Sequence, residues 1–238
     1  DGGDSIASFE IGTNLKLTPS AVQEYKRDSS LIGYWTFDEG SGSTVYDSSG
    51  NGYNGAWEST IAYSTGKVGP YAGSFPGTNG VDVSVSSSAF LSLTSNITVS
   101  GWIKPVVIAG CASTIIGWGY DYTNGKGYLF YLDSAYYSTS LRLNGAGGLV
   151  VKSDPSSISD NVWVYVTATY DGHFGKVYIN GLQQNIGSYS TAISNTSTTP
   201  SIGGVNGGGR YQGLIDDLRV YNRVLSAAEI LALYDGTK

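Results

Sequence analysis

The amino-acid sequence predicts an all-β fold in which two antiparallel sheets pack face to face as a β-sandwich, with one short C-terminal helix. Three observations support this prediction. The 238 residues include 34 Gly and 19 Tyr but only 13% charged residues, a composition typical of short strands joined by tight turns. Many segments after residue 30 alternate between apolar and polar side chains. A convincing helical pattern occurs only near the end of the chain.

The expected strands follow one another along the chain. Residues 81–85 (VDVSV) alternate cleanly between apolar and polar side chains, which predicts one buried and one exposed face. Residues 128–132 (YLFYL) are apolar on both faces and predict a strand that is covered on both sides. The complete set of expected strands is 32–37, 81–85, 97–103, 128–132, 140–144, 149–151, 162–170, 176–179 and 214–221.

Local signals mark one hairpin and the helix. The dipeptides Asp171-Gly172 and Asn180-Gly181 enclose residues 176–179, and they supply the positive φ angles that tight hairpin turns require. Ser226 and Glu229 form a capping box ahead of an apolar segment, which predicts a helix start. Gly236 is a suitable end for that helix.

Composition also narrows the range of partners. The net charge is −6 and the lysines are scattered singly, which argues against nucleic-acid binding. No apolar run approaches the ~20 residues of a membrane-spanning helix. Cys111 is the single cysteine, so neither an internal disulfide nor a cysteine metal site is expected. We expect residues 1–30 to be a leader or the remnant of a preceding module, and residues 31–238 to form the sandwich.

Six segments in order resemble a known family. They are residues 34–42 with 47–55 (YWTFDEGSG and DSSGNGYNG), 73–75 with 81–83, 98–103, 163–172, 177–181 and 213–226 (GLIDDLRVYNRVLS). Together they resemble the bacterial laminin-G-like domains of the concanavalin A-like lectin/glucanase superfamily. The resemblance implies a jelly-roll sandwich, often a bound Ca²⁺, and adhesion to carbohydrate or protein, but it does not fix the ligand. Residues 1–15 resemble the tails of prepilin-like bacterial surface proteins, in which a hydrophobic pilin helix would come first.

The superfamily includes glucanases, so catalysis needs a separate argument. Retaining glycoside hydrolysis needs two carboxyl groups ~5 Å apart, and those glucanases carry them as Glu-x-Asp-x-(x)-Glu on one strand. No such string occurs in this sequence. Asp216 and Asp217 are adjacent and therefore point to opposite faces of a regular strand. His173 is the single histidine and lies in an expected turn. We therefore predict that the chain is not an enzyme.

Four carboxylates near strand ends are candidate ligands of a structural Ca²⁺: Asp38, Asp47, Asp216 and Asp217. Calcium prefers six to eight hard oxygen ligands, and the glycine-rich turns beside these residues can offer carbonyl oxygens. Asp216 shares a face with Leu214 and Leu218, where an unpaired carboxylate would be costly. The alternative is that Asp47 caps an Asx-turn and Asp216 accepts hydrogen bonds from backbone N–H groups.

Loop aromatics beside polar residues are the candidate ligand site. Exposed Trp and Tyr rings stack on the apolar face of a sugar, while neighbouring Asp and Asn bind its hydroxyl groups. The residues that fit this pattern are Trp118, Tyr120, Asp121, Tyr122, Asn124, Tyr136 and Tyr137. The alternative is a tyrosine-rich surface that packs loops or a neighbouring subunit. We expect the aromatics within strands, namely Trp35, Phe37, Phe75, Trp102, Phe130 and Trp163, to lie in the core.

These arguments predict an extracellular, non-catalytic module that binds a glycan or a surface protein on a bacterial cell surface or appendage. Assembly into a larger surface structure is compatible with this prediction. The alternative is a structural spacer or pilus-associated head with calcium as its single ligand. A glycoside hydrolase is the third and most distant interpretation.

Overall fold

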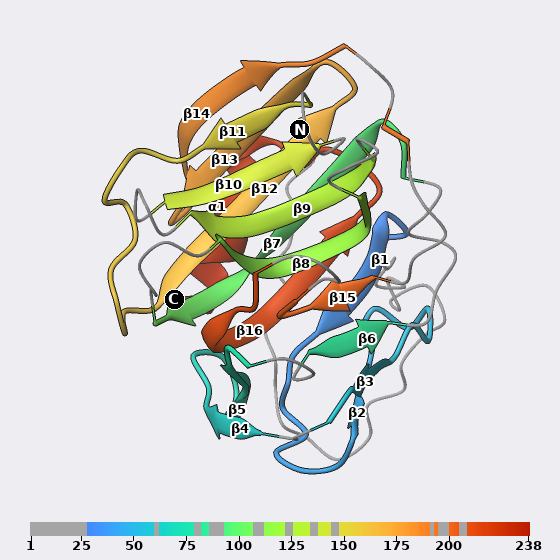
Figure 1. Ribbon diagram of the computed structural model, residues 1–238, viewed down its shortest axis with the longest axis vertical. Helices are drawn as coiled ribbons and strands as arrows, with labels where there is room; N and C mark the ends of the chain where they lie inside the picture. The colour runs from blue at the N-terminus through green and yellow to red at the C-terminus, as the bar shows by residue number, and fades with distance from the viewer. Residues whose placement is uncertain are drawn as a thin grey trace, which may run out of the picture.

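The computed structural model describes a two-layer β-sandwich, as the sequence predicts (Figure 1). The description covers residues 28–59, 62–78, 82–85, 93–106, 112–121, 126–133, 138–143, 148–190, 193–194, 200–204 and 209–238. The expected leader therefore lies almost entirely outside the described residues, and its boundary stays a prediction. No helix among the described segments has the length and apolarity needed to cross a membrane.

The first layer, sheet A, is an antiparallel sheet with the strand order β14-β13-β12-β7-β16-β5-β4, and β1 also pairs with β16. Its central strands β7 and β16 are long and almost continuously buried. The strands of sheet A are β1 (Leu31–Trp35), β4 (Tyr63–Thr65), β5 (Tyr71–Pro76), β7 (Asn96–Pro105), β12 (Val164–Asp171), β13 (Phe174–Ile179), β14 (Leu182–Ser188) and β16 (Gln212–Tyr221).

The second layer, sheet B, lies in front of sheet A in Figure 1 and has the order β11-β10-β9-β8-β15-β6-β3-β2. Its strands are β2 (Thr44–Val45), β3 (Gly55–Trp57), β6 (Val83–Val85), β8 (Ala112–Asp121), β9 (Lys126–Asp133), β10 (Ser138–Leu143), β11 (Val150–Lys152) and β15 (Ser201–Ile202). The segment 128–132 is buried on both faces, as its apolar composition predicts.

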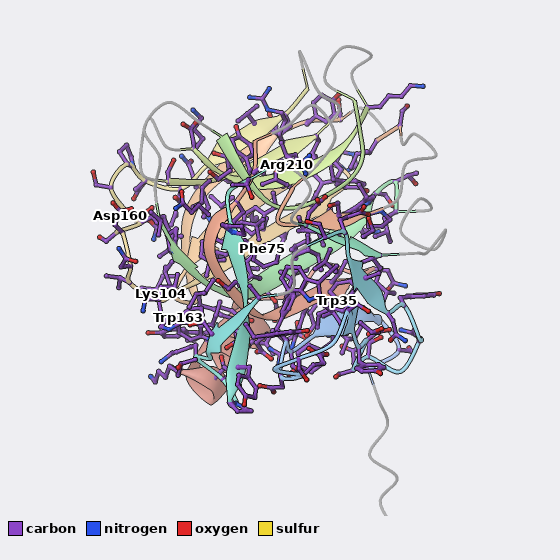
Figure 2. The ribbon with its side chains drawn as sticks, turned by 60° about the horizontal axis from the view of Figure 1, so that its bottom comes forward. Trp35, Phe75, Lys104, Asp160, Trp163 and Arg210 are labelled. Atoms are coloured by element: carbon purple, nitrogen blue, oxygen red, sulfur yellow. The ribbon has the colours of Figure 1, made fainter. Side chains whose placement is uncertain are left out.

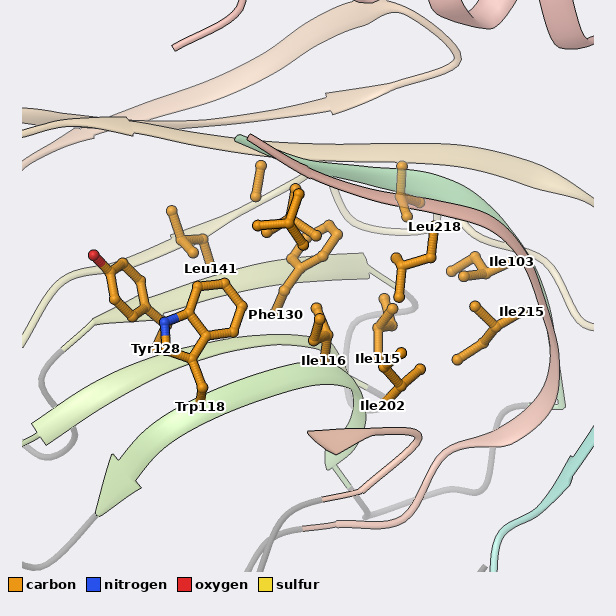
Figure 3. Close-up of a cluster of buried hydrophobic side chains, with 14 of the residues drawn as sticks. Ile103, Ile115, Ile116, Trp118, Tyr128, Phe130, Leu141, Ile202, Ile215 and Leu218 are labelled. Carbon is orange, nitrogen blue, oxygen red and sulfur yellow. The ribbon is translucent and has the colours of Figure 1, made fainter. Parts of the chain in front are cut away.

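The core fills the space between the two sheets. Alternate side chains of each strand point inward, so Trp118 and Phe130 from sheet B share one core cluster with Ile103, Ile215 and Leu218 from sheet A (Figure 3). Of the strand aromatics expected in the core, Trp35, Phe37, Phe75 and Phe130 are buried there. Continuous burial of such large side chains is the main favourable contribution to the stability of the sandwich.

The helix α1 (Ala227–Thr237) covers part of the outer face of sheet A. Ser226 and Glu229 form the expected capping box, and Gly236 lies within the helix rather than beyond its end. Trp102 is buried, but on this outer face: its indole N–H donates to Thr237 Oγ1 at 2.9 Å, and its ring packs against Tyr165.

Two aromatic residues lie in places that the sequence did not predict. Trp163, expected in the core, is half-buried and precedes the first residue of β12. Its neighbour Val164 faces the core, so strand alternation turns Trp163 towards the outside. Trp118, expected in an exposed loop, lies in β8 with only 2% of its surface exposed. Its ring packs on Tyr128, with centroids 4.9 Å apart, so the prediction of an exposed stacking ring at this position is wrong.

Candidate functional site

The long strand β16 changes its neighbour halfway along, and this branch point organises the candidate site. One edge of β16 pairs with β7, whereas the other edge pairs with β5 at residues 212–215 and with β1 at residues 218–221. Asp216 and Asp217 lie between these two pairings, where the register with β7 also shifts. The sheet therefore opens at these two carboxylates, and the turn between β4 and β5 passes beside them.

Asp216 is fully buried and only partly satisfied. Its Oδ2 accepts hydrogen bonds from the backbone N–H groups of Lys67 and Val68, at 2.7 and 2.9 Å. Its Oδ1 has no partner among the described residues. Burial raises the pKa of Asp216 to about 7, with a smaller contribution from the charges of Asp217 and Asp38, while the two N–H donors oppose the shift. A cation beside Oδ1 would keep this carboxylate ionised.

Asp217 is just as buried, but its carboxylate is paired with an arginine. Arg219 Nη1 lies 2.8 Å from Asp217 Oδ2, and Nη2 donates to Oδ1 at 3.0 Å. The hydroxyl of Tyr34 also donates to Oδ1, and the Arg219 guanidinium lies over the Tyr34 ring, 4.4 Å from its centroid. Burial still raises the pKa of Asp217, although Arg219 and Tyr34 act against this shift. The chain itself supplies the cation for this carboxylate.

Asp38 follows β1 and borders the same turn as Asp216. Its Oδ1 accepts a hydrogen bond from the backbone N–H of Tyr71 at 3.2 Å. A Cβ added to Gly69, which has a φ of +71°, would overlap the Asp38 carboxylate. The turn between β4 and β5 therefore approaches Asp38 so closely that only glycine fits at position 69.

Asp47 serves a different purpose, because its two oxygens accept four hydrogen bonds. Oδ1 accepts from the backbone N–H groups of Tyr34 (3.0 Å) and Ser49 (2.8 Å). Oδ2 accepts from the Ser49 hydroxyl (2.8 Å) and from the Tyr53 N–H (2.9 Å). This is the Asx-turn arrangement that the sequence left open as the alternative to a calcium ligand.

The backbone beside both key carboxylates adopts a conformation that side chains disfavour. Phe37, which precedes Asp38, has a φ of 59°, and Asp217, which follows Asp216, has a φ of 53°. Non-glycine residues seldom occupy this left-handed region, and such residues often cluster at functional sites. The fully buried ring of Phe37 packs against Trp57 and Phe75, and these contacts hold the residue in place.

The junction of Asp38, Asp216 and the residue 66–70 turn fits a hard cation. It offers an orphaned buried carboxylate oxygen, a second carboxylate and a backbone at close approach, and these oxygens are the ligand type that calcium prefers. Among the described residues, no cluster of three or more His, Cys, Asp or Glu side chains could hold a metal ion. An ion at this junction therefore needs carbonyl oxygens or waters in addition to the two carboxylates.

The loop aromatics give less information. Tyr120 and Asp121 lie at the end of β8. Tyr122, Asn124, Tyr136 and Tyr137 lie outside the described residues. Their assignment to a ligand site stays a prediction, now without Trp118.

Sequence reasoning missed the partners that distinguish the two adjacent carboxylates. The N–H donors of Lys67 and Val68 are almost 150 residues away from Asp216 in sequence, so no local pattern announces them. Arg219 was detectable, because a basic residue two positions after Asp217 lies on the same face of a strand. The positive φ of Asp217 had no sequence signal, since glycine or asparagine usually marks such positions.

Comparison with known proteins identifies the family of this chain. A family model described as the concanavalin A-like lectin/glucanases superfamily (Laminin_G_3) matches residues 75–231, about two thirds of the chain. The chain belongs to this family. The family predicted from the sequence is thereby confirmed, together with its jelly-roll fold.

Solved structures share the fold of this Laminin_G_3 domain at low sequence identity. Domain 4 of AbnA, a GH43 extracellular arabinanase from Geobacillus stearothermophilus in complex with arabinotriose, aligns with a TM-score of 0.67 and 23% identity, covering 86% of this chain and 98% of that domain. The binding domain of Paraclostridial Mosquitocidal Protein 1 aligns with a TM-score of 0.68 and 17% identity, covering 87% of this chain and 52% of that one. The botulinum neurotoxin serotype G binding domain aligns with a TM-score of 0.67 and 20% identity, covering 86% of this chain and 50% of that one.

One curated relative is similar in sequence over a shorter stretch. Human pappalysin-1 is 28% identical over 101 residues, which are 40% of this chain and 6% of pappalysin-1. The chain thus corresponds to a small part of that relative, and to about half of each toxin binding domain.

Proposed function

We propose that this Laminin_G_3 domain is an extracellular, non-catalytic module that binds a glycan or a surface protein and is stabilised by one Ca²⁺. The observation that carries the proposal is the likeness to AbnA domain 4. The structure of that domain is in complex with arabinotriose, and the match covers 98% of the domain. The toxin binding domains add weaker support, because the match covers only about half of each.

The surroundings of the buried carboxylates support a role without catalysis. Asp216 and Asp217 are 0% and 1% exposed, so a polysaccharide cannot reach either group. Asp217 is also ion-paired with Arg219, which removes it as a free acid or nucleophile. Glycoside hydrolysis needs two accessible carboxyl groups on either side of the scissile bond. We expect no release of reducing ends from β-glucan or arabinan above a buffer blank, and turnover abolished by a single Asp or Glu substitution would contradict this.

The proposed Ca²⁺ would be held by Asp216 through its free Oδ1 and by Asp38. Asp47 and Asp217 are weaker candidates than the sequence suggested, because hydrogen bonds and Arg219 already occupy their oxygens. When bound, the ion would supply positive charge to the buried Asp216 carboxylate. It would join the end of β1 to β16 and to the turn before β5, which are three segments distant in sequence.

The proposed binding function is tested by screening the full chain against an array of neutral and acidic oligosaccharides that includes arabinotriose. The screen is run in Ca²⁺ and again in EGTA, with heat-denatured protein as the control. We expect saturable binding by the folded chain that weakens in EGTA as the domain loses stability. If no oligosaccharide binds while the domain still responds to Ca²⁺, the glycan part of the proposal is wrong and the structural spacer is favoured.

A further inference from the structure

A hollow on the outer face of sheet A has a lining that includes neither Asp38 nor Asp216. It has a volume of about 340 Å³ and lies where the ends of β5 and β7 meet the start of β16. Its lining residues are Ser74, Phe75, Pro76, Lys104, Val106, Asn161, Gln212, Gly213 and Leu214. Neither the family match nor the loop pattern in the sequence assigns a role to this surface.

Strand register places three of the lining residues side by side. Leu214 pairs with Ser74 on one side and with Lys104 on the other, so these three residues form a row across β5, β16 and β7. Ile103 and Ile215 belong to the core, so this row, one residue away on both strands, faces outward. Most of the lining therefore lies on strands of sheet A, and Val106 and Asn161 come from the segments that follow β7 and precede β12.

Trp163 borders this row. The pairing of β12 with β7 ends at Val164 and Ile103, and the Asn161 N–H still donates to the Pro105 carbonyl at 2.8 Å. The backbone of Trp163 consequently runs beside Lys104, and Figure 2 shows the two labelled residues next to each other. The Trp163 side chain is half-buried, in contrast to Trp102, which α1 covers on the same sheet face.

The lining combines the groups that saccharide sites use. Asn161 and Gln212 offer amide donors and acceptors, Ser74 offers a hydroxyl, and Leu214 and Val106 form an apolar surface. Of the described residues that line the hollow, Lys104 alone carries a charge, within a chain whose net charge is −6. An ammonium group without a carboxylate in the same lining is complementary to an anionic ligand.

We propose that this hollow, bordered by Trp163, binds a saccharide that carries a carboxylate, namely a hexuronic acid residue of an acidic glycan. Trp163 stacks on the sugar ring, Lys104 binds the carboxylate, and Asn161 and Gln212 bind hydroxyl groups. The inference rests on the proposed glycan-binding function and deepens it by naming a site and a ligand class. It places the site on the sheet face, not at the aromatic residues, such as Tyr122 and Tyr137, that the sequence predicts as a ligand site.

The test measures the affinity of the full chain for trigalacturonate, for its methyl ester and for arabinotriose by isothermal titration calorimetry. We expect trigalacturonate to bind more tightly than its ester. Trp163→Ala should weaken trigalacturonate binding at least about tenfold, as expected for losing a central aromatic contact. Trp163→Phe, which keeps a ring, should retain most of the affinity. Lys104→Met should remove the preference for the acid over the ester.

Matched controls separate the site from its surroundings. Tyr46→Ala removes an aromatic ring that is 59% exposed elsewhere, and Lys176→Met removes a lysine from β13, so both variants should bind like the wild type. Melting curves check that each variant is folded. If the wild type binds but Trp163→Ala and Lys104→Met leave affinity unchanged while Tyr137→Ala abolishes it, the site lies in the loops and the sheet-face proposal is wrong. If no oligosaccharide on the array binds the wild type, the proposed function fails and this site fails with it.

Discussion

Asp216 and Asp217 are neighbours in sequence, and both are buried at the branch point of sheet A, yet their surroundings differ. Asp217 faces Arg219 and Tyr34, so its charge is neutralised within the protein. Asp216 faces two backbone N–H groups and keeps one buried oxygen without a partner among the described residues. The comparison teaches that the same residue type can form a complete ion pair at one position and keep an unpartnered buried oxygen at the next, where we propose a cation.

Burial alone therefore does not identify a metal ligand. A buried carboxylate must be neutralised by a proton, a basic side chain or a bound cation. The bulge at Asp217, which has a φ of 53°, interrupts the regular alternation of β16. Both carboxylates of the Asp216–Asp217 pair can therefore be buried, although the two residues are adjacent.

The largest expected effect comes from breaking the complete pair. Arg219→Met leaves the Asp217 carboxylate buried without its cation, and we expect the free energy of unfolding to fall by roughly 3–5 kcal/mol. Chemical denaturation measures this loss, and it should be equal in Ca²⁺ and in EGTA. The double variant Asp217→Leu with Arg219→Met should recover much of the stability. A cost below about 1 kcal/mol for Arg219→Met would show that the pair does not matter.

A smaller effect is expected at Asp47, whose carboxylate orders the segment after β1. Asp47→Ala deprives three backbone N–H groups and one hydroxyl of their acceptor, and should cost about 2–3 kcal/mol. The stability gained on adding Ca²⁺ should stay the same as in the wild type, because the side chain serves the turn. A lost calcium response in a folded Asp47→Ala variant would return Asp47 to the set of ligands.

The smallest effect concerns the exposed ion pairs that join Asp28, before β1, to the start of α1. Arg223 lies 2.8 Å from Asp28 and 2.7 Å from Glu229. Hydrogen bonds from Ser30 and Arg223 lower the pKa of Asp28 to about 2, and those from Arg223 and Ser226 lower the pKa of Glu229 to about 2. Depressed carboxylate pKa values add stability above about pH 4, and this contribution is lost as the pH falls towards 2.

Because these groups are exposed, Arg223→Ala should cost less than about 1 kcal/mol at pH 7. The difference between this variant and the wild type should shrink in denaturation curves recorded at successively lower pH. A difference that grows on acidification would contradict the assignment. Lys238→Ala, which removes the exposed pair with Asp235 in α1, is a matched control for losing one surface ion pair.

Much of the fold follows from local sequence patterns, whereas the site depends on distant contacts. The alternation of residues 97–103 and 214–221 predicts β7 and β16, and the Ser226–Glu229 capping box predicts α1. Sequence also singles out Asp216, because a carboxylate interrupts an apolar face. It does not reveal that β16 exchanges β5 for β1 beside that residue, since sheet pairing joins segments far apart in the chain.

The two tryptophans whose positions the sequence did not predict also have a physical explanation. The sequence predicts Trp118 in a loop, yet β8 continues through it to Asp121. Trp163 lies in an apolar run that begins at Val162, which predicts a core position, but β12 starts at Val164 and Val164 takes the inward position. In both cases a shift of a few residues in a strand boundary decides which face a ring occupies.

The most direct test of the contrast between the two carboxylates is the melting temperature of the wild type and Asp216→Asn, each in Ca²⁺ and in EGTA. At a free Ca²⁺ concentration a hundredfold above Kd, binding stabilises the wild type by about 2.7 kcal/mol, which corresponds to a rise of roughly 5–10 °C. Asp216→Asn should melt at the same temperature in both solutions, while Asp47→Asn keeps the rise. Identical wild-type melting curves in Ca²⁺ and EGTA would contradict the account and leave Asp216 as a hydrogen-bonded turn residue.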